Sequence, residues 1–253
     1  MEHLMIIGII AIGLLAGFFS GMLGIGGGLL MVPFLSLIAG IPVSEARAPS
    51  LFAIMVNTPV GIYKYSRHGN VQWKAGLILG LFGIAGVVAA NFADAALAKR
   101  FSVDYESILS VSFAILMAYT AVRMLVRFDS KPHKERLYFF PLIGFGAGFL
   151  AKFLGIGGGG IIVPSLALIG IPIHNAVATS LVAVFMNGTF STVVNLTAGH
   201  DWIWLGIALG IGAIAGAPIG VTVAKKTKPH MLRRIFGVFM LVVAARMALS
   251  AFL

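Results

Sequence analysis

The chain has 253 residues, of which 59% are hydrophobic and only 10% are charged. Soluble domains carry about a quarter charged residues, so this composition excludes an ordinary soluble fold. The net charge is +10, but the basic residues lie in short clusters between apolar runs, and we expect no nucleic-acid partner. The chain has no cysteine, which excludes disulfides and thiolate chemistry.

Apolar segments recur along the chain and are separated by short polar segments. In the first half they cover residues 4–23, 29–39, 47–63, 75–97 and 108–126. Most are long enough to cross about 30 Å of hydrocarbon as helices. The first segment lacks the basic region that begins a signal peptide, so we interpret it as a mature transmembrane segment. The sequence therefore predicts an all-α polytopic membrane protein, with the lipid bilayer as its solvent.

The second half of the chain repeats the pattern of the first. When residues 24–28 are aligned with residues 155–159, both of which read Gly-Ile-Gly-Gly-Gly, Pro33 falls on Pro164. Further matched pairs are Pro42 and Pro172, Ser50 and Ser180, Asn57 and Asn187, Gly86 and Gly216, and Arg123 and Arg246. Such self-similarity indicates an internal duplication. We predict a first repeat over residues 1–128, a linker over 129–136 and a second repeat over 137–253.

Each half contains five apolar segments, and an odd number inverts the second repeat relative to the first. Basic residues cluster at Lys64, Arg67 and Lys74, at Arg127, Lys131, Lys134 and Arg136, and at Lys225, Lys226, Lys228, Arg233 and Arg234. Two inverted repeats of about five helical segments each place all three clusters on one face. The positive-inside rule assigns that face to the cytoplasm, with both termini on the outer face. Four segments per half would split the clusters between the two faces.

The second segment of each half is too short for a full crossing, which needs about 20 residues. The first two segments of each half therefore form either two crossings or a re-entrant hairpin, and the loop charges fit both. We favour broken or re-entrant helices at the glycine loops, because the two loops then meet near the membrane midplane, where inverted-repeat transporters bind substrate.

A helix that restarts after a glycine loop directs free backbone N–H groups and the positive end of its dipole at the loop. This arrangement suits an anion. The alternative is that the glycines only permit close helix packing. Packing is the interpretation we prefer for Gly13, Gly17 and Gly21, which have GxxxG spacing. The same spacing occurs at Gly212, Gly216 and Gly220.

We expect the substrate to be bound by both glycine loops and by polar residues near them. The candidate residues are Gly24, Gly26, Gly27, Gly28, Gly155, Gly157, Gly158 and Gly159, together with Ser50, Asn57, Lys152, Thr179, Ser180 and Asn187. Ser50 and Asn57 are seven residues apart on one helix face, as are Ser180 and Asn187. Interhelical hydrogen bonding is the alternative role for these side chains. Lys152 lies in an apolar run, where an ionisable side chain marks a functional site unless it snorkels to the interface.

Other ionisable residues do not suggest chemistry inside the membrane. Arg47, Arg123 and Arg246 lie near segment ends, where we expect the side chains to snorkel. The carboxylates and histidines lie in or near loops and segment ends, which argues against a metal site or a buried proton relay. Residues 155–160 match G-x-G-x-x-G, but no strand precedes them, so we expect no dinucleotide. We predict no enzyme activity, no cofactor and no metal, and anion movement driven by its own gradient and the membrane potential. Proton or cation coupling through Glu45 or backbone carbonyls is the alternative.

The two Gly-Ile-Gly-Gly-Gly loops, with Pro33 and Pro164 behind them, are joined by Ala-Thr-Ser-Leu at residues 178–181. With these motifs the sequence resembles the sulfite exporter TauE/SafE family, also called the toluene sulfonate uptake permeases, over essentially the whole chain. The first copy departs from the motif at Pro49. The resemblance implies transport of small sulfur-containing anions such as sulfite, an organosulfonate or sulfoacetate across a prokaryotic inner membrane. We expect export by alternating access, and the alternatives are an anion channel or a non-transporting assembly partner.

Overall fold

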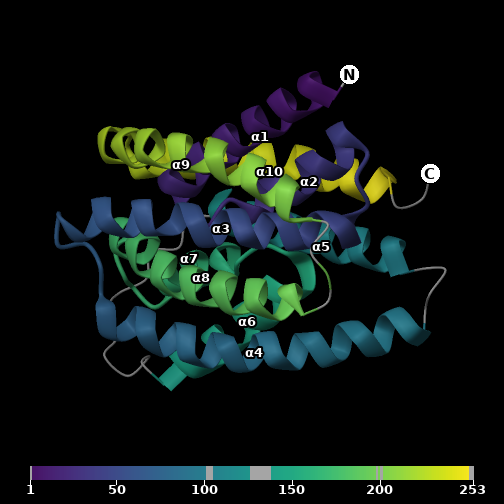
Figure 1. Ribbon diagram of the computed structural model, residues 1–253. Coiled ribbons are helices and arrows are strands. Elements are labelled where there is room, and N and C mark those ends of the chain that lie inside the picture. Colours follow the sequence, from purple (N-terminus) through teal and green to yellow (C-terminus); the bar gives the residue numbers. More distant parts are fainter. Residues whose placement is uncertain (1, 101–104, 126–137, 198, 200–201, 251–253) are drawn as a thin grey trace.

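A computed structural model describes residues 2–100, 105–125, 138–197, 199 and 202–250. The described residues contain ten helices (Figure 1). In chain order they are α1 (Glu2–Leu23), α2 (Gly28–Ala39), α3 (Val43–Ser66), α4 (Trp73–Arg100), α5 (Tyr105–Leu125), α6 (Phe140–Leu154), α7 (Gly159–Leu168), α8 (Ile173–Leu196), α9 (Ile203–Lys226) and α10 (Pro229–Ser250). These residues contain no β-strand, and the all-α prediction is confirmed. The linker predicted over residues 129–136 lies outside the described residues.

The helices differ in whether they can cross a membrane. Five of those described, α1, α4, α5, α8 and α9, are long and apolar enough to do so. α2 and α7 have 12 and 10 residues. At 1.5 Å per residue they are about 18 and 15 Å long, which is too short for a full crossing. The chain is therefore an integral membrane protein with two short helices inside it.

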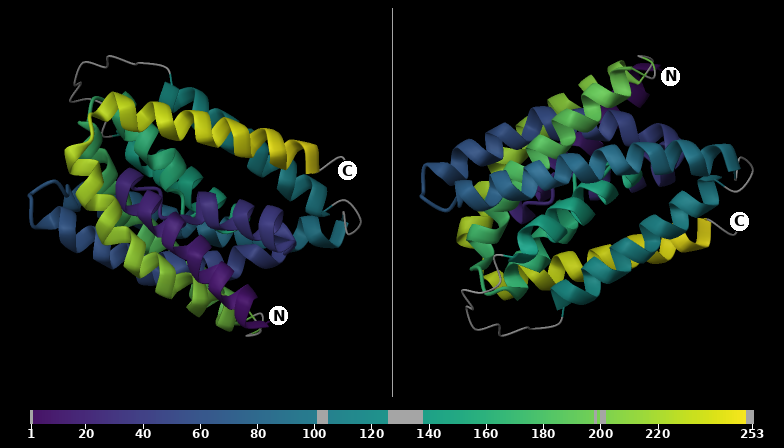
Figure 2. Two further views of the ribbon diagram at one scale, coloured as in Figure 1. Left: turned by 90° about the horizontal axis from the view of Figure 1, so that it is seen from above. Right: turned by 90° about the horizontal axis from the view of Figure 1, so that it is seen from below.

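The main helix contacts of the first half have counterparts in the second half, and several of these contacts join a helix of one half to a helix of the other. α1 packs along α9, and α6 packs along α4. α3 packs on α9 and α8 on α4, while α2 lies on α3 and α7 on α8. α5 pairs with α10, and α3 crosses α8 (Figure 2). The two halves are therefore interleaved, and each depends on the other for its buried surface.

Glycines bring the α1 and α9 backbones together. A Cβ at Gly17 would lie 2.5 Å from the Cα of Ala213, and a Cβ at Gly216 would lie 2.7 Å from the backbone nitrogen of Phe18. Real Cβ atoms do not approach backbone this closely, so only glycine fits at these positions. The packing role predicted for the GxxxG glycines of these helices is confirmed.

The two ends of the molecule carry different side chains. The basic end, as we call it, contains the α3–α4 turn and the end of α9, where Lys225 Nζ lies 2.9 Å from His68 Nε2. The opposite end contains the starts of α3 and α5, where the Ser44 backbone N–H donates to the Glu106 carboxylate at 3.2 Å. The start of α1 and the end of α10 also lie at the opposite end (Figures 1 and 2).

Two helical hairpins enter the molecule from these two ends. α1 and α2 are joined by the glycine loop at residues 24–27, and their hairpin opens toward the opposite end (Figure 1). α6 and α7 are joined by the loop at residues 155–158, and their hairpin opens toward the basic end (Figure 2). The tips of both hairpins are buried inside the helical assembly.

Candidate functional site

The two glycine loops have the same backbone conformation. Gly27, the residue before α2, has φ 85°, and Gly158, the residue before α7, has φ 88°. Both values lie in the left-handed region, which side chains other than glycine disfavour. No side chain caps the helix that follows either glycine. The sequence repeat therefore encodes one local structure, used twice.

The loops lie directly against one another. A Cβ at Gly28 would lie 2.5 Å from the carbonyl oxygen of Gly155, and a Cβ at Gly159 would lie 2.6 Å from the carbonyl oxygen of Gly24. A side chain at either position would push the two backbones apart. Glycine at both positions thus allows the start of each short helix to contact the loop of the other half.

Serine side chains of α3 and α8 hold the loops from opposite halves. Ser50 Oγ donates to the carbonyl oxygen of Gly155 at 2.6 Å, and Ser180 Oγ donates to that of Gly24 at 2.7 Å. Each hydroxyl also lies 2.8 Å from a carbonyl of its own helix, which shares the proton. The matched serines therefore position the glycine loops. Because each hydroxyl proton is used in these bonds, only the oxygen lone pairs of the two serines remain available.

Backbone donors of both loops are left unpaired. The N–H groups of residues 26–29 and 157–160 donate to no acceptor among the described residues. All of these residues are buried. Buried backbone N–H groups are nearly always paired with protein, water or ligand. Two such sets at the starts of two helices, in contact with each other, make a place that suits an anion.

Two asparagines lie one helical turn beyond the residues that contact the loops. Ile54 and Val184 touch the second loop, since a Cβ at Gly157 would lie 3.0 Å from Val184 Cγ1 and 3.1 Å from Ile54 Cδ1. Asn57 and Asn187, three residues further along α3 and α8, are fully buried. Asn57 contacts α1 through Ser20, and Asn187 lies against α4, since a Cβ at Gly83 would overlap Asn187 Oδ1.

Both asparagines have unused hydrogen-bonding atoms. Asn57 Oδ1 accepts from Ser20 Oγ at 3.4 Å, while its Nδ2 has no partner within the described chain. Neither Oδ1 nor Nδ2 of Asn187 has one. The hydroxyls of Thr189, Ser191 and Thr192 on α8 are likewise buried and unpaired there. A buried polar atom left unsatisfied costs about 1–3 kcal/mol, so this polar stretch of α8 is a further indication of a ligand.

Lys152 lies at the end of α6, three residues before the second loop. Its side chain is only 8% exposed, and its Nζ donates to Asn195 Oδ1 of α8. The burial does not fit a lysine that snorkels to the interface. No carboxylate of the described chain forms an ion pair with it. Lys152 therefore contributes a buried positive charge beside the loops.

One pair of contacting positions occurs in both halves, but the long side chain comes from a different member of the pair in each half. Gly21 and Lys152 correspond in the repeat, as do Tyr65 and Asn195. In the first half Tyr65 reaches the Gly21 carbonyl oxygen at 2.9 Å, whereas in the second half Lys152 reaches Asn195. The first half therefore has a neutral phenol where the second half has a cation, and the site is asymmetric.

Arg47 is a functional-site neighbour that sequence reasoning missed. The expectation that it snorkels is wrong, because its side chain is 12% exposed and bonds Asp94 Oδ1 at 2.7 Å. It also donates to the Phe153 carbonyl oxygen at 2.9 Å and to Tyr105 Oη at 3.0 Å. This cluster fastens the end of α6, next to Lys152, to α3, α4 and α5. Its members are distant in sequence, so no local signal could have revealed it.

Thr179 takes a position away from the loops. Its Oγ1 accepts a hydrogen bond from the Gln72 backbone N–H at 3.1 Å, in the turn that leads into α4. The neighbouring Ser180 faces the first loop instead. Of the predicted candidates, Thr179 is thus the one that the structure uses to join α8 to the basic end.

A family model described as "Sulfite exporter TauE/SafE" matches residues 9–247. The chain belongs to the sulfite exporter TauE/SafE family. It is 30% identical to a probable membrane transporter protein of Methanocaldococcus jannaschii, over 92% of this chain and 94% of the relative. It is 31% identical to a probable membrane transporter protein of Haemophilus influenzae, over 94% of this chain and 96% of the relative. A sulfite exporter TauE/SafE family protein of Arabidopsis thaliana is 30% identical over 56% of this chain and 36% of its own.

This TauE/SafE family member is therefore a membrane transporter and not an enzyme. The name of the family and the chemistry of the glycine loops agree on a small anion as substrate.

Proposed function

We propose that this protein is a secondary transporter that exports a small sulfur-containing anion, of the sulfite, organosulfonate or sulfoacetate class. The anion binds between the two glycine loops, which touch in this structure and move apart to admit it, and it crosses by alternating access. The observation that carries the proposal is the pair of buried loops whose N–H groups at residues 26–29 and 157–160 have no acceptor in the described chain. Oxyanions supply several acceptor atoms, which matches two converging sets of donors.

Side chains complete the proposed site. Asn57 Nδ2 and Asn187 Nδ2 add buried donors that have no partner among the described residues. Lys152 offsets the charge of the anion, and Asn195 orients its ammonium group. Ser50 and Ser180 act on the substrate through the loops that they hold. Thr179 contributes through the placement of α8.

The orientation in the membrane follows from the basic end. We assign residues 1–128 and 137–253 to two repeats of inverted orientation, which the exchanged helix contacts and the two oppositely opening hairpins support. Lys64, Arg67 and Lys225 lie together at one end, so the positive-inside rule places that end in the cytoplasm. Both termini then lie on the outer face of a prokaryotic inner membrane.

Alternating access has a physical basis in the loop contacts. Because the loops touch each other and each is bonded to the helix of the other half, opening toward one face changes contacts on both loops. Rocking of one repeat against the other exposes the shared site to one face at a time.

The test is flux through the purified full chain in liposomes. Vesicles loaded with sulfite, with taurine or with sulfoacetate are diluted into anion-free buffer, and efflux is followed at several internal concentrations. We expect saturable efflux of at least one sulfur anion, slowed in Asn187→Ala. Efflux that never saturates, accompanied by single-channel currents, would show a channel, and the absence of efflux for all these anions would contradict the proposed substrate class.

A further inference from the structure

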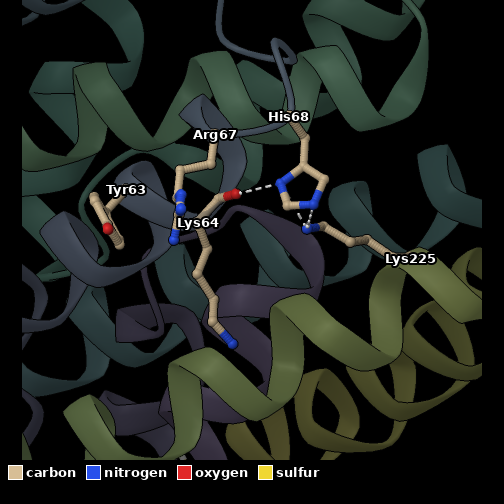
Figure 3. Close-up of a pocket in the computed structure, with 5 residues that line it drawn as sticks. All are labelled: Tyr63, Lys64, Arg67, His68 and Lys225. Carbon is tan, nitrogen blue, oxygen red and sulfur yellow. Dashed lines mark hydrogen bonds between the residues drawn. The ribbon is translucent and has the colours of Figure 1, made fainter.

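A cavity lies at the basic end, away from the glycine loops. It has a volume of about 480 Å³ and is lined by Tyr63, Lys64, Arg67, His68 and Lys225 (Figure 3). The first four residues come from the end of α3 and the turn after it, and Lys225 comes from the end of α9. We call this cavity the basic pocket.

Hydrogen bonds between the two halves fix the shape of the basic pocket. Lys64 Nζ donates to the Pro218 carbonyl oxygen at 2.8 Å and lies 3.2 Å from Thr222 Oγ1, both on α9. His68 Nδ1 lies 2.8 Å from the Lys64 carbonyl oxygen, and Lys225 Nζ lies within 3.0 Å of both ring nitrogens of His68 (Figure 3). The fold therefore places these basic groups around one pocket, with the Lys64 ammonium directed at α9 (Figure 3).

Among the described residues, no carboxylate balances the positive charge of the basic pocket. Lys64, Arg67 and Lys225 form no ion pair with any described carboxylate. Lys64 and Lys225 also repel each other across the pocket. Arg67 lies over the ring of Tyr63, with its Cζ 5.7 Å from the ring centroid, which leaves its N–H groups available. The site is complementary to a multiply bonding anion such as a phosphate group.

An apolar groove adjoins the basic pocket. Its volume is about 500 Å³, and it shares Tyr63 with the basic pocket. The other lining residues are Pro59, Ile62, Ser66, Trp73, Leu77, Val182, Phe185 and Met186. Tyr63 and Trp73 are 61% and 51% exposed, as is typical of aromatic side chains in the headgroup layer of a bilayer. The groove thus lies on the lipid-facing side of the molecule and meets the basic pocket at Tyr63.

We propose that the basic pocket and the apolar groove together bind one anionic phospholipid, with the phosphate group in the pocket and an acyl chain in the groove. A free phosphate would leave the apolar groove unfilled, and a neutral lipid would leave the cationic side chains without a counter-charge among the described residues. Basic pockets between transmembrane helices on the cytoplasmic side are suited to acidic headgroups. Because the pocket joins α3 of the first half to α9 of the second, the bound lipid links the two halves at this end.

The test measures lipid binding to the purified full chain in a neutral detergent. Native mass spectrometry is used to titrate phosphatidylglycerol and phosphatidylcholine with identical acyl chains. The pocket variant is Arg67→Gln with Lys225→Gln. The matched control is Lys74→Gln with Lys226→Gln, which removes the same charge from exposed residues of the same end that do not line the pocket.

We expect phosphatidylglycerol to bind more tightly than phosphatidylcholine to the wild type and to the control. In the pocket variant its Kd should rise on the order of tenfold or more, to that of phosphatidylcholine. Leu77→Asn, in the groove, should weaken both lipids. Equal binding of the two lipids by the wild type, or the same loss in the control as in the pocket variant, would overturn the proposal.

Two competition experiments distinguish the source of the anion. We expect neither excess inorganic phosphate nor excess sulfite to displace phosphatidylglycerol. Displacement by phosphate would show a simple anion site, and displacement by sulfite would assign the pocket to the transport path. Sulfite-dependent thermal stabilisation should persist in the pocket variant, because the glycine loops are unchanged, so failure of the lipid site and failure of the proposed transport site give different results.

Discussion

The hydroxyl of Ser50 donates a hydrogen bond to the carbonyl oxygen of Gly155 at 2.6 Å, between α3 of the first half and the glycine loop of the second. Ser180 and Gly24 make the reciprocal bond at 2.7 Å. Each half thus holds the loop of the other. A loop can move only if its serine moves with it or the bond breaks, so these two contacts couple the loops to the long helices.

Removal of either serine hydroxyl should loosen the loop that it holds. Ser50→Ala and Ser180→Ala should each lower the free energy of unfolding by about 1 kcal/mol and slow sulfur-anion efflux. Thr197→Ala is the control, because its hydroxyl donates to the Val194 carbonyl oxygen of its own helix at an exposed position away from the loops. Thermal melts and liposome efflux check this. A Ser50→Ala/Ser180→Ala double variant with wild-type stability and flux would contradict the role assigned to these bonds.

Gly158→Ala should damage the protein more than Gly40→Ala. Both glycines have a positive φ, but only at Gly158 would the new Cβ also meet other atoms. The left-handed conformation disfavours a side chain by about 1–2 kcal/mol at each position. At Gly158 the new Cβ would also lie 2.6 Å from the Ala147 carbonyl oxygen, whereas at Gly40, with φ 68°, nothing lies within 4 Å. Gly40→Ala should lower the melting temperature and retain transport. Gly158→Ala should lose transport, and equal behaviour of the two variants would show that the loop contact is unimportant.

The Asn187→Ala variant tests whether Asn187 binds the substrate or stabilises the fold. Its Oδ1 and Nδ2 have no partner among the described residues, so Asn187→Ala removes no hydrogen bond of the ligand-free protein. We expect an unchanged or higher melting temperature without ligand, because an unsatisfied buried amide is removed. The rise in melting temperature that a bound sulfur anion causes should disappear.

The same experiment includes a control for the asparagine. Asn195→Ala breaks the bond to Lys152 and should lower the melting temperature even without ligand. If Asn187→Ala behaves in the same way, Asn187 is a structural residue and the site lies elsewhere.

The cluster of Arg47 and Asp94 should contribute to stability through neutralisation of a buried charge. Asp94→Asn leaves Arg47 without its carboxylate, and Arg47→Met leaves Asp94 without its guanidinium. Loss of one partner from a buried ion pair costs about 3 kcal/mol or more, and the cost here should be somewhat lower because the side chains are 12% and 20% exposed. An Arg47→Met/Asp94→Leu double variant should regain part of the loss in a thermal melt. Additive effects of the two single changes would show that the residues are not coupled.

Local patterns were enough to predict the helical architecture and the special loops. Glycine at positions that need positive φ, followed by an apolar helix, is visible in the sequence, and its repetition at residues 24–28 and 155–159 marks both loops. The short length of α2 and α7 is equally visible. Packing roles of glycines such as Gly17 follow from their spacing, because small residues at that spacing line one helix face.

Interactions between distant residues could not be predicted in the same way. Arg47 and Asp94 are separated by 47 residues, and Lys64 bonds a carbonyl 154 residues away. Polar residues such as Asn57 and Asn187 were recognised by their repetition, but only the packing shows which of their atoms lack a partner. The contrast between Tyr65 with Gly21 and Asn195 with Lys152 likewise depends on which side chain fills a shared space.

Thermal stability of the purified protein, measured with sulfite, sulfoacetate, taurine, sulfate, chloride and phosphate, tests anion binding between the glycine loops most directly, since a ligand that binds only the folded state raises the melting temperature. We predict a selective rise with one sulfur anion, retained in Gly40→Ala and lost in Asn187→Ala and Lys152→Gln. No rise with any of these anions, or a rise that is unchanged in both site variants, would contradict a substrate site at the loops.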